Sequence, residues 1–167
     1  IQSLGLLKPE SMGKPFSPIA GWKVTLSSAG HILGASSVLV EVAGRRILFS
    51  GDLGRPDDLL MPPPDQPPLA DTVLIESTYG NREHPEDNVI AELGNALKKV
   101  SARGGVAVLP VFAVGRAQAI LYAISLLKER GDIPHGLPVF LDSPMAVHTT
   151  ELYKKHPHAH RLNAQGI

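Results

Sequence analysis

The sequence contains no cysteine among its 167 residues. This absence excludes disulfide bonds and zinc sites that are built from thiolates. Any metal ion held by the chain must therefore be bound by imidazole nitrogens and carboxylate oxygens. The sequence also lacks an apolar run near the ~18 residues that a membrane-spanning helix requires, so we expect no transmembrane segment and no membrane partner.

An excess of charge of either sign is also absent, because 16 Lys and Arg residues balance 16 Asp and Glu residues. This balance gives no electrostatic argument for binding to nucleic acid, but it leaves room for a local basic groove. Apolar residues make up 43% of the sequence, which predicts a packed core. The length suits one ordinary domain or two small ones.

The sequence begins with Ile1 instead of methionine and shows no signal peptide. We therefore expect it to be a piece of a longer protein. The missing signal peptide and the missing cysteine fit a bacterial or archaeal cytoplasm, so a cytoplasmic location is predicted.

The first half of the chain has the alternating pattern of β-strands. Three strands are predicted, at Trp22–Leu26, Ser36–Val42 and Arg45–Ser50. Ala43 and Gly44 separate the last two strands, which predicts a tight hairpin turn. Six prolines in the range 56–68 exclude a helix or a central strand there and predict a surface loop.

From about Gly80 onward, helical periodicity alternates with short apolar runs. The predicted helices are 87–99, 117–129 and 144–153, and the predicted buried strands are 106–111 and 139–141. Ser143 as N-cap and Pro144 at the first helical position support the last helix. Strands that alternate with helices predict a parallel sheet with crossover helices. The change of pattern therefore predicts a domain boundary near Gly80.

Three polar side chains follow apolar strands of the first half. His31 and Asp52 are each flanked by glycines, and Glu76 directly continues the apolar run 72–75. Glycines let the backbone approach a ligand closely, and ligands commonly bind at strand ends. Each residue also has a structural interpretation: an exposed histidine, an aspartate that caps a turn, and a glutamate in a salt bridge. A glutamate after a buried strand needs a partner, or its pKa is raised.

Five ordered segments of the chain resemble the β-CASP branch of the metallo-β-lactamase superfamily. They are SAGHILGA (28–35), FSGDLGR (49–55), IESTYGNR (75–82), VFAVGRAQ (111–118) and LDSPMA (141–146). Within this branch, the sequence is similar to RNA-processing nucleases akin to the endonuclease of the cleavage and polyadenylation factor. The resemblance extends from about Trp22 to His156.

The resemblance implies an α/β fold in two incomplete parts. Residues 1–80 would be the C-terminal part of a metallo-β-lactamase αββα sandwich, and residues 81–167 the first part of a parallel-sheet β-CASP domain. It also implies that His31 binds one zinc ion, that Asp52 bridges two, and that Glu76 is a catalytic residue paired with a later histidine. Two zinc ions would activate a water molecule and stabilise charge on a phosphate.

The resemblance further implies that part of the metal site is missing from this chain. The family's motif His-x-His-x-Asp-His has no counterpart here, and its two later histidines would follow Ile167. Because a zinc ion takes four ligands, or three and a water molecule, we expect the chain alone to be inactive. We interpret the segment 156–160, which holds three histidines without an aspartate, as the polar end of a helix. Exposed sheet edges would make a homodimer an expected remedy.

Arg116, at the start of a predicted helix, is a candidate phosphate contact, because helix N-termini and guanidinium groups bind anions. A surface salt bridge is the alternative for Arg116, and Ser143 is a weaker candidate of the same kind. His84 is either part of the site or exposed in a loop. His135 and His148 are expected at the surface.

We therefore expect the intact protein to be a zinc-dependent phosphodiester hydrolase, a ribonuclease of RNA processing with an endo- or exonuclease action. Two alternatives stay open: a DNA nuclease of the same branch, and a non-catalytic family member that binds RNA or a protein partner. Neutral composition does not separate RNA from DNA. The presence of His31 and Asp52 argues against the non-catalytic alternative, because inactive members usually lose metal ligands.

Overall fold

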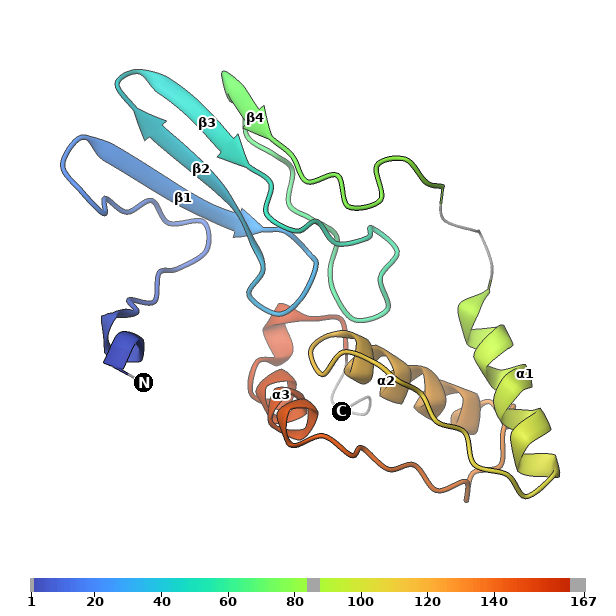
Figure 1. Cartoon of the computed structure of the whole chain (residues 1–167). Helices are drawn as coiled ribbons and strands as arrows, with labels where there is room; N and C mark the ends of the chain where they lie inside the picture. Colours follow the sequence, from blue (N-terminus) through green and yellow to red (C-terminus); the bar gives the residue numbers. More distant parts are fainter. Residues whose placement is uncertain (1, 84–87, 163–167) are drawn as a thin grey trace. The chain divides into compact units, whose positions relative to one another are not determined.

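The structure, a computed structural model, describes residues 2–83 and 88–162 (Figure 1). His84 lies outside these residues. The chain divides into two compact units, Ile1–Thr78 and Tyr79–Ile167, which we call the sheet unit and the helical unit. The sheet unit has a short 3₁₀ helix, η1 (Gln2–Leu6), and a four-stranded sheet, and the helical unit has three α-helices. The predicted mixed α/β fold is therefore confirmed.

The sheet has the strand order β1-β2-β3-β4. The strands are β1 (Trp22–Ser28), β2 (Ser36–Val42), β3 (Arg45–Phe49) and β4 (Thr72–Leu74). The first three pair antiparallel, and β4 pairs parallel with β3. The alternation in the sequence predicted β1 to β3 correctly, because every second side chain of a strand faces the same side. Val24 and Val40 are paired across β1 and β2 and are both buried.

A tight turn at Ala43 and Gly44 joins β2 and β3, as predicted. Both residues have positive φ angles, 50° and 72°, and the flanking residues Val42 and Arg45 are paired. Two positive φ angles between paired strands define the type I′ turn, whose twist matches that of the strands. Glycine adopts this conformation freely, whereas alanine is strained in it.

Replacing Ala43 by Asn is expected to raise the free energy of unfolding by about 0.5–1 kcal/mol, because Asn tolerates positive φ and Asn-Gly is a preferred type I′ pair. Urea-induced unfolding measures this change. Ala43→Val should shift stability in the opposite direction, since a β-branched side chain is poorly suited to positive φ. A stabilised valine variant would contradict the turn assignment.

Strand β4 differs from its sequence prediction in burial. Val73, Leu74 and Ile75 are 54%, 48% and 68% exposed, so the run before Glu76 is not a buried strand. The reason is its position, because β4 lies at the end of the strand order and, among residues 2–83 and 88–162, pairs with β3 alone. An apolar run shows that a segment is suited to burial, but a neighbouring element must cover it.

The proline-rich segment 56–68 is a loop without helix or strand, as predicted, but it is not confined to the surface. Leu60 and Met61 are 1% and 4% exposed, and the carboxylate of Asp58 accepts hydrogen bonds from both of their amides. Asp65 fastens the loop to Ser28 at the end of β1 through two hydrogen bonds of 2.7 and 2.9 Å. The loop therefore packs beside the connection that follows β1.

The helical unit contains α1 (Val89–Ala102), α2 (Arg116–Glu129), α3 (Pro144–Lys155) and the short 3₁₀ helix η2 (Pro157–Ala159). All three predicted helices are confirmed within a few residues. Ser143 caps α3 as predicted, since its side chain accepts a hydrogen bond from the Ala146 amide. The core packs α1 against α2, and its buried residues are Leu97, Ile124, Leu127 and Ile133.

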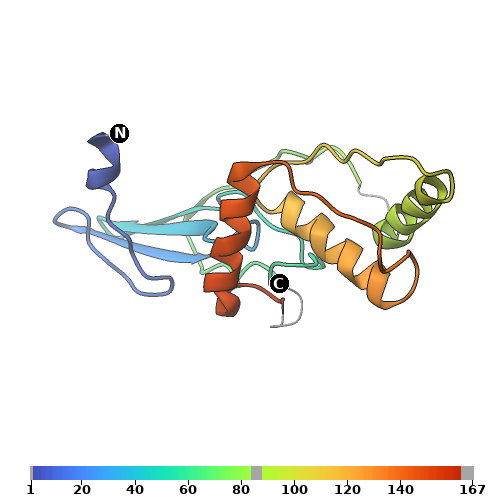
Figure 2. The same cartoon turned by 90° about the horizontal axis from the view of Figure 1, so that it is seen from below.

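The predicted strands 106–111 and 139–141 are not strands in the described part of the chain, which corrects the sequence analysis. Both segments are irregular and run in the same direction across the helical unit (Figures 1 and 2). Val106, Val108 and Phe140 are more than four-fifths exposed. A strand of a parallel sheet is held by hydrogen bonds to its neighbours, and no described segment pairs with either run. The apolar pattern of a segment indicates that it is suited to a strand, but it does not show whether a neighbouring strand is present to pair with it.

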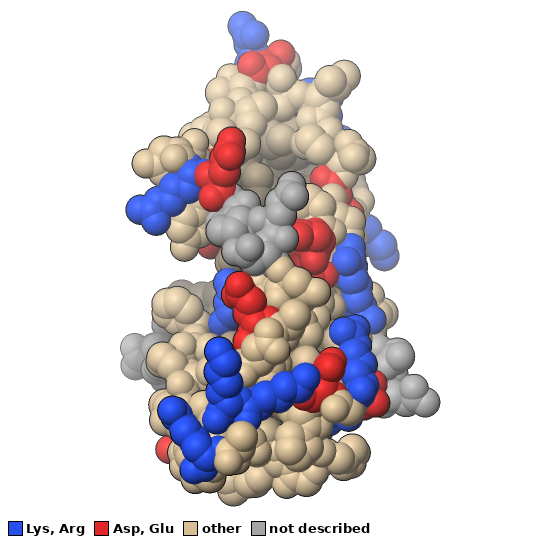
Figure 3. All heavy atoms as spheres, turned by 90° about the vertical axis from the view of Figure 1, so that its right-hand side faces the viewer, with Lys and Arg blue, Asp and Glu red and all other residues tan. Residues whose placement is uncertain are grey.

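Charged side chains of both signs lie on the face drawn in Figure 3, and acidic side chains stand among the basic ones. Within the helical unit, Lys98 and Asp132 form an ion pair at 3.6 Å. Among the helices of residues 2–83 and 88–162, none combines the length and the apolar character needed to cross a membrane.

Candidate metal centre

Three predicted site residues follow strands that end at the same edge of the sheet. Strands β1 and β3 are both antiparallel to β2, and β4 is parallel to β3, so β1, β3 and β4 all point the same way. His31 follows β1, Asp52 follows β3 and Glu76 follows β4. The topology thus brings the three residues to one edge of the sheet, although up to 45 positions separate them in the sequence.

A close backbone contact joins the loop of His31 to the loop of Asp52. The amide of Gly54 donates a hydrogen bond of 2.8 Å to the carbonyl of Ala29, which is fully buried. A Cβ atom on Gly54 would overlap the carbonyl oxygen of Gly30. Only glycine at position 54 therefore allows the two loops to approach this closely.

Glu76 is bound to the Asp52 loop by its side chain. Its Oε1 accepts a hydrogen bond of 2.8 Å from the amide of Leu53, the residue after Asp52. Its Oε2 accepts hydrogen bonds from the hydroxyl and the amide of Thr78, at 2.7 and 3.3 Å. The carboxylate is thus held by three donors, two of them from its own segment and one from the Asp52 loop.

The hydroxyl of Thr78 and the amide of Leu53 hold the pKa of Glu76 below its usual value, although partial burial opposes the shift. The charge of His31 also lowers the pKa of Glu76. The sequence pattern predicted either a partner or a raised pKa for this residue. The structure shows partners, and they favour the charged carboxylate because all of them donate to it.

The hydrogen bonds of Glu76 predict that stability depends on pH. Its folded-state pKa is lowered, so its contribution is fully present above the ordinary value of 4.5 and is lost as the pH falls through the folded-state pKa. Urea unfolding between neutral and strongly acidic pH should therefore show a smaller loss of stability on acidification in Glu76→Gln than in the unaltered chain. Equal losses in both chains would contradict the prediction.

Ser50 is a residue of this sheet edge that the sequence pattern did not single out. It is 7% exposed, and its Oγ donates to the Gly51 carbonyl at 2.7 Å while accepting from the Glu76 amide at 3.0 Å. Its own amide donates to the Leu74 carbonyl at 2.9 Å. The sequence signal that could have identified Ser50 is its place at the end of an apolar strand, directly before Gly51 and Asp52.

The donors at this edge of the sheet suit a metal ion in type but not in number. His31 and Asp52 are exposed, and imidazole and carboxylate groups are suitable ligands for zinc. Within the described ranges, however, no group of three or more His, Cys, Asp or Glu residues is arranged to hold a metal ion. The donors have the right chemistry, but those described here are too few for a complete zinc site.

Arg116, the predicted phosphate contact, is the first residue of α2 in the helical unit and is exposed. The N-cap of α2 is Gly115, which provides no side-chain hydrogen bond, and the first turn carries no acidic residue. The buried side chain of Gln118 fixes the start of α2 by donating to the carbonyls of Ala113 and Ala146, at 3.1 and 3.2 Å. Arg116 thus belongs to the helical unit, whereas His31, Asp52 and Glu76 belong to the sheet unit.

The other histidines in the described part of the chain have no shared site. His135 and His148 are exposed, as predicted. His160 is buried: its Nδ1 accepts from the Leu162 amide at 3.1 Å, and its Nε2 lies 2.9 Å from the Tyr153 carbonyl. His160 therefore packs inside, which differs from the polar helix end predicted for the segment 156–160.

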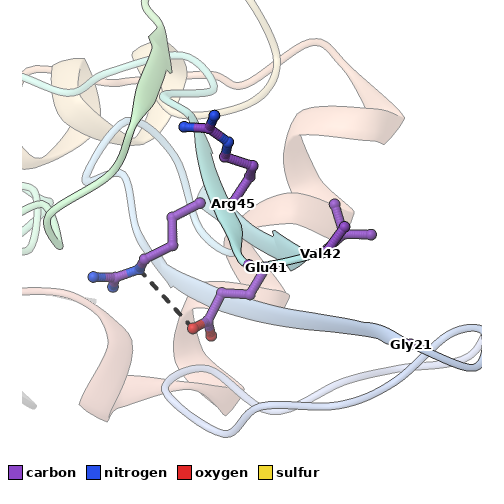
Figure 4. Close-up of a pocket in the computed structure, with 7 residues that line it drawn as sticks. Gly21, Glu41, Val42 and Arg45 are labelled. Atoms are coloured by element: carbon purple, nitrogen blue, oxygen red, sulfur yellow. Dashed lines mark ion pairs between the residues drawn. The ribbon is translucent and has the colours of Figure 1, made fainter.

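A hollow of about 310 Å³ lies at the hairpin turn, at the other end of β2 and β3 from the candidate site (Figure 4). Gly21 and the turn segment 41–46 line it. Glu41 in this hollow pairs with Lys23 at 2.9 Å and with Arg46 at 3.9 Å, and Lys23 holds the pKa of Glu41 below its usual value. Because the hollow lies at the turn end of β2 and β3, away from the loops of His31, Asp52 and Glu76, it does not belong to the candidate site.

Comparison with known proteins gives a family match and several relatives. Residues 117–167 match the Beta-Casp domain family. The chain is 38% identical to a ribonuclease of Thermus thermophilus over 155 residues, which are 92% of this chain and 35% of the relative. It is 35% identical to the cleavage and polyadenylation specificity factor subunit 3 of Dictyostelium discoideum over 136 residues, 80% of this chain and 18% of the relative.

A further relative is the endoribonuclease YSH1 of Saccharomyces cerevisiae, which is 39% identical over 133 residues, 77% of this chain and 17% of the relative. The chain thus spans about a third of the bacterial relative and less than a fifth of the two eukaryotic ones.

Proposed function

Because the chain belongs to the β-CASP branch of the metallo-β-lactamase superfamily, we propose that the protein that carries this sequence is a ribonuclease that depends on two zinc ions. The observation that carries the proposal is the sheet edge at which β1, β3 and β4 end, each followed by one of His31, Asp52 and Glu76. An imidazole and two carboxylates at one edge suit a reaction in which metal ions meet a phosphate.

Each of these residues has a separate proposed role. His31 would supply one nitrogen ligand, and the carboxylate of Asp52 would be shared by two ions, because its negative charge would offset the repulsion between two dications. Bound zinc ions supply an activated water molecule and stabilise negative charge on the phosphate. Because a zinc ion takes about four ligands, the remaining donors come from outside the described residues.

Glu76 and Arg116 have the two other proposed roles. Glu76 is ionised near neutral pH, and its hydrogen bond to Leu53 keeps the Asp52 loop in place. It is also the carboxylate that pairs with a later catalytic histidine. Arg116, whose exposed guanidinium stands at the start of α2, contacts a phosphate of the substrate.

RNA is the proposed substrate because the relatives named above include a ribonuclease and an endoribonuclease. A DNA substrate is the alternative that the experiment must separate. A cytoplasmic location and a homodimer are further proposals that rest on the sequence alone.

The test is a cleavage assay of the protein that carries this sequence, with one labelled RNA and the single-stranded DNA of the same base sequence. RNA cleavage is expected to stop after a chelator removes the metal and to return when Zn²⁺ is added. His31→Ala should abolish cleavage, whereas His135→Ala, at an exposed position of the helical unit, should preserve it. Unchanged cleavage in His31→Ala would overturn the proposal. If the protein cleaves the DNA but not the RNA, the substrate is DNA instead of RNA.

A further inference from the structure

Ser50 and Glu76 close a ring of hydrogen bonds between the ends of two neighbouring strands. The hydroxyl of Ser50 accepts from the Glu76 amide and donates to the Gly51 carbonyl. The carboxylate of Glu76 then returns to the same loop by accepting from the Leu53 amide. The residues before and after Asp52, Gly51 and Leu53, are therefore both bonded within the ring, while Asp52 itself is exposed.

Further contacts fix Ser50 itself. Its amide donates to the Leu74 carbonyl at 2.9 Å, and its carbonyl accepts from the Ser37 hydroxyl at 2.6 Å. The side chain is almost fully buried at 7% exposure, so water cannot easily replace its hydrogen bonds. The neighbouring Gly51 has a φ of +61°, and a Cβ atom there would collide with the Ser36 carbonyl. The backbone after Ser50 is therefore closely packed against β2 and requires glycine at position 51.

We propose that Ser50 is a positioning residue of the metal centre, whose hydroxyl fixes the Gly51–Gly54 loop so that Asp52 is held ready for its ligands. The proposal rests on the proposed function, because it concerns the placement of a metal ligand. Ser50 touches neither the metal nor the substrate and acts through Asp52 and Glu76. Groups that orient a ligand in this manner commonly change metal affinity or activity by about 10- to 100-fold when they are removed.

Amide hydrogen exchange of the metal-free protein provides the first test, because it requires neither metal nor activity. In Ser50→Ala, exchange at the amides of Glu76 and Leu53 should become about tenfold faster or more, since the first loses its acceptor and the second lies in the loosened loop. Ser50→Thr retains the hydroxyl and should restore slow exchange at both amides. Ser125→Ala is the matched control, because Ser125 also donates to a backbone carbonyl, at 2.8 Å, but within α2.

A Zn²⁺ titration and RNA-cleavage kinetics provide the second test. Ser50→Ala should weaken Zn²⁺ binding about 10- to 100-fold and lower kcat with little change in KM, and Ser50→Thr should recover most of both. Unchanged exchange at Leu53 in Ser50→Ala overturns the proposal, and so does unchanged Zn²⁺ affinity. If the wild-type protein neither binds Zn²⁺ nor cleaves RNA, the proposed function is contradicted. The hydrogen-exchange rates of the Glu76 and Leu53 amides then still decide whether Ser50 holds the loop.

Discussion

If the proposed function holds, replacing Asp52 by Asn is expected to lower the rate of RNA cleavage about a thousandfold, because two metal ions would contribute several kcal/mol of transition-state stabilisation and a neutral amide would not bridge them. Asparagine has nearly the same shape as aspartate, so the loop between Ser50 and Gly54 should keep its fold. The loss should therefore appear in kcat and in the bound zinc, while the stability of the protein changes little.

The measurement combines single-turnover cleavage of RNA with elemental analysis of zinc after dialysis. Asp57→Asn is a suitable control, because Asp57 is a nearby exposed carboxylate that pairs with Arg55 at 3.0 Å and has no role in the proposed site. The control should cleave RNA at the wild-type rate. Wild-type zinc content and cleavage in Asp52→Asn would show that another carboxylate holds the metal ions.

Replacing Gly54 by Ala is expected to lower the free energy of unfolding of the sheet unit by about 3 kcal/mol, the upper part of the range for overpacked sites. The added Cβ would overlap the carbonyl oxygen of Gly30, and backbone atoms yield less readily than the end of a flexible side chain. The loops of His31 and Asp52 would have to separate, so zinc binding should weaken together with stability.

Urea unfolding followed by a spectroscopic signal of Trp22, the single tryptophan, reports on the sheet unit. Gly5→Ala is the matched control, because a Cβ at Gly5 meets no atom within 4 Å in the same unit. Its stability should remain close to that of the unaltered chain. A Gly54→Ala variant as stable as this control would contradict the close contact between the two loops.

Local patterns in the sequence were sufficient to predict most of the elements. Alternating apolar residues predicted β1 to β3, helical periodicity predicted α1 to α3, and Ser143 with Pro144 predicted the start of α3. These predictions succeeded because strand and helix formation depend on periodicities and caps that lie within a few residues of one another.

Burial was harder to predict, because it depends on segments distant in the sequence. The apolar runs 106–111 and 139–141 lack a pairing strand in the described part of the chain and are largely exposed. Leu60 and Met61 lie within a proline-rich loop and are nevertheless buried, since Asp58 and Asp65 fold that loop back. Periodicity indicates which side of a segment is apolar, but it does not identify the segment that covers it.

The sequence by itself determined the order of the strands along the chain and the polar residue that follows each one, and its motifs indicated the β-CASP family. It therefore singled out His31, Asp52 and Glu76 as candidates. Only the tertiary structure decided how their loops are held, through the contact of Gly54 with Gly30 and the hydrogen bonds of Ser50. Ser50 and Glu76 are 26 positions apart, and hydrogen bonds over such separations leave no periodic signal, because they form only after the strands have paired.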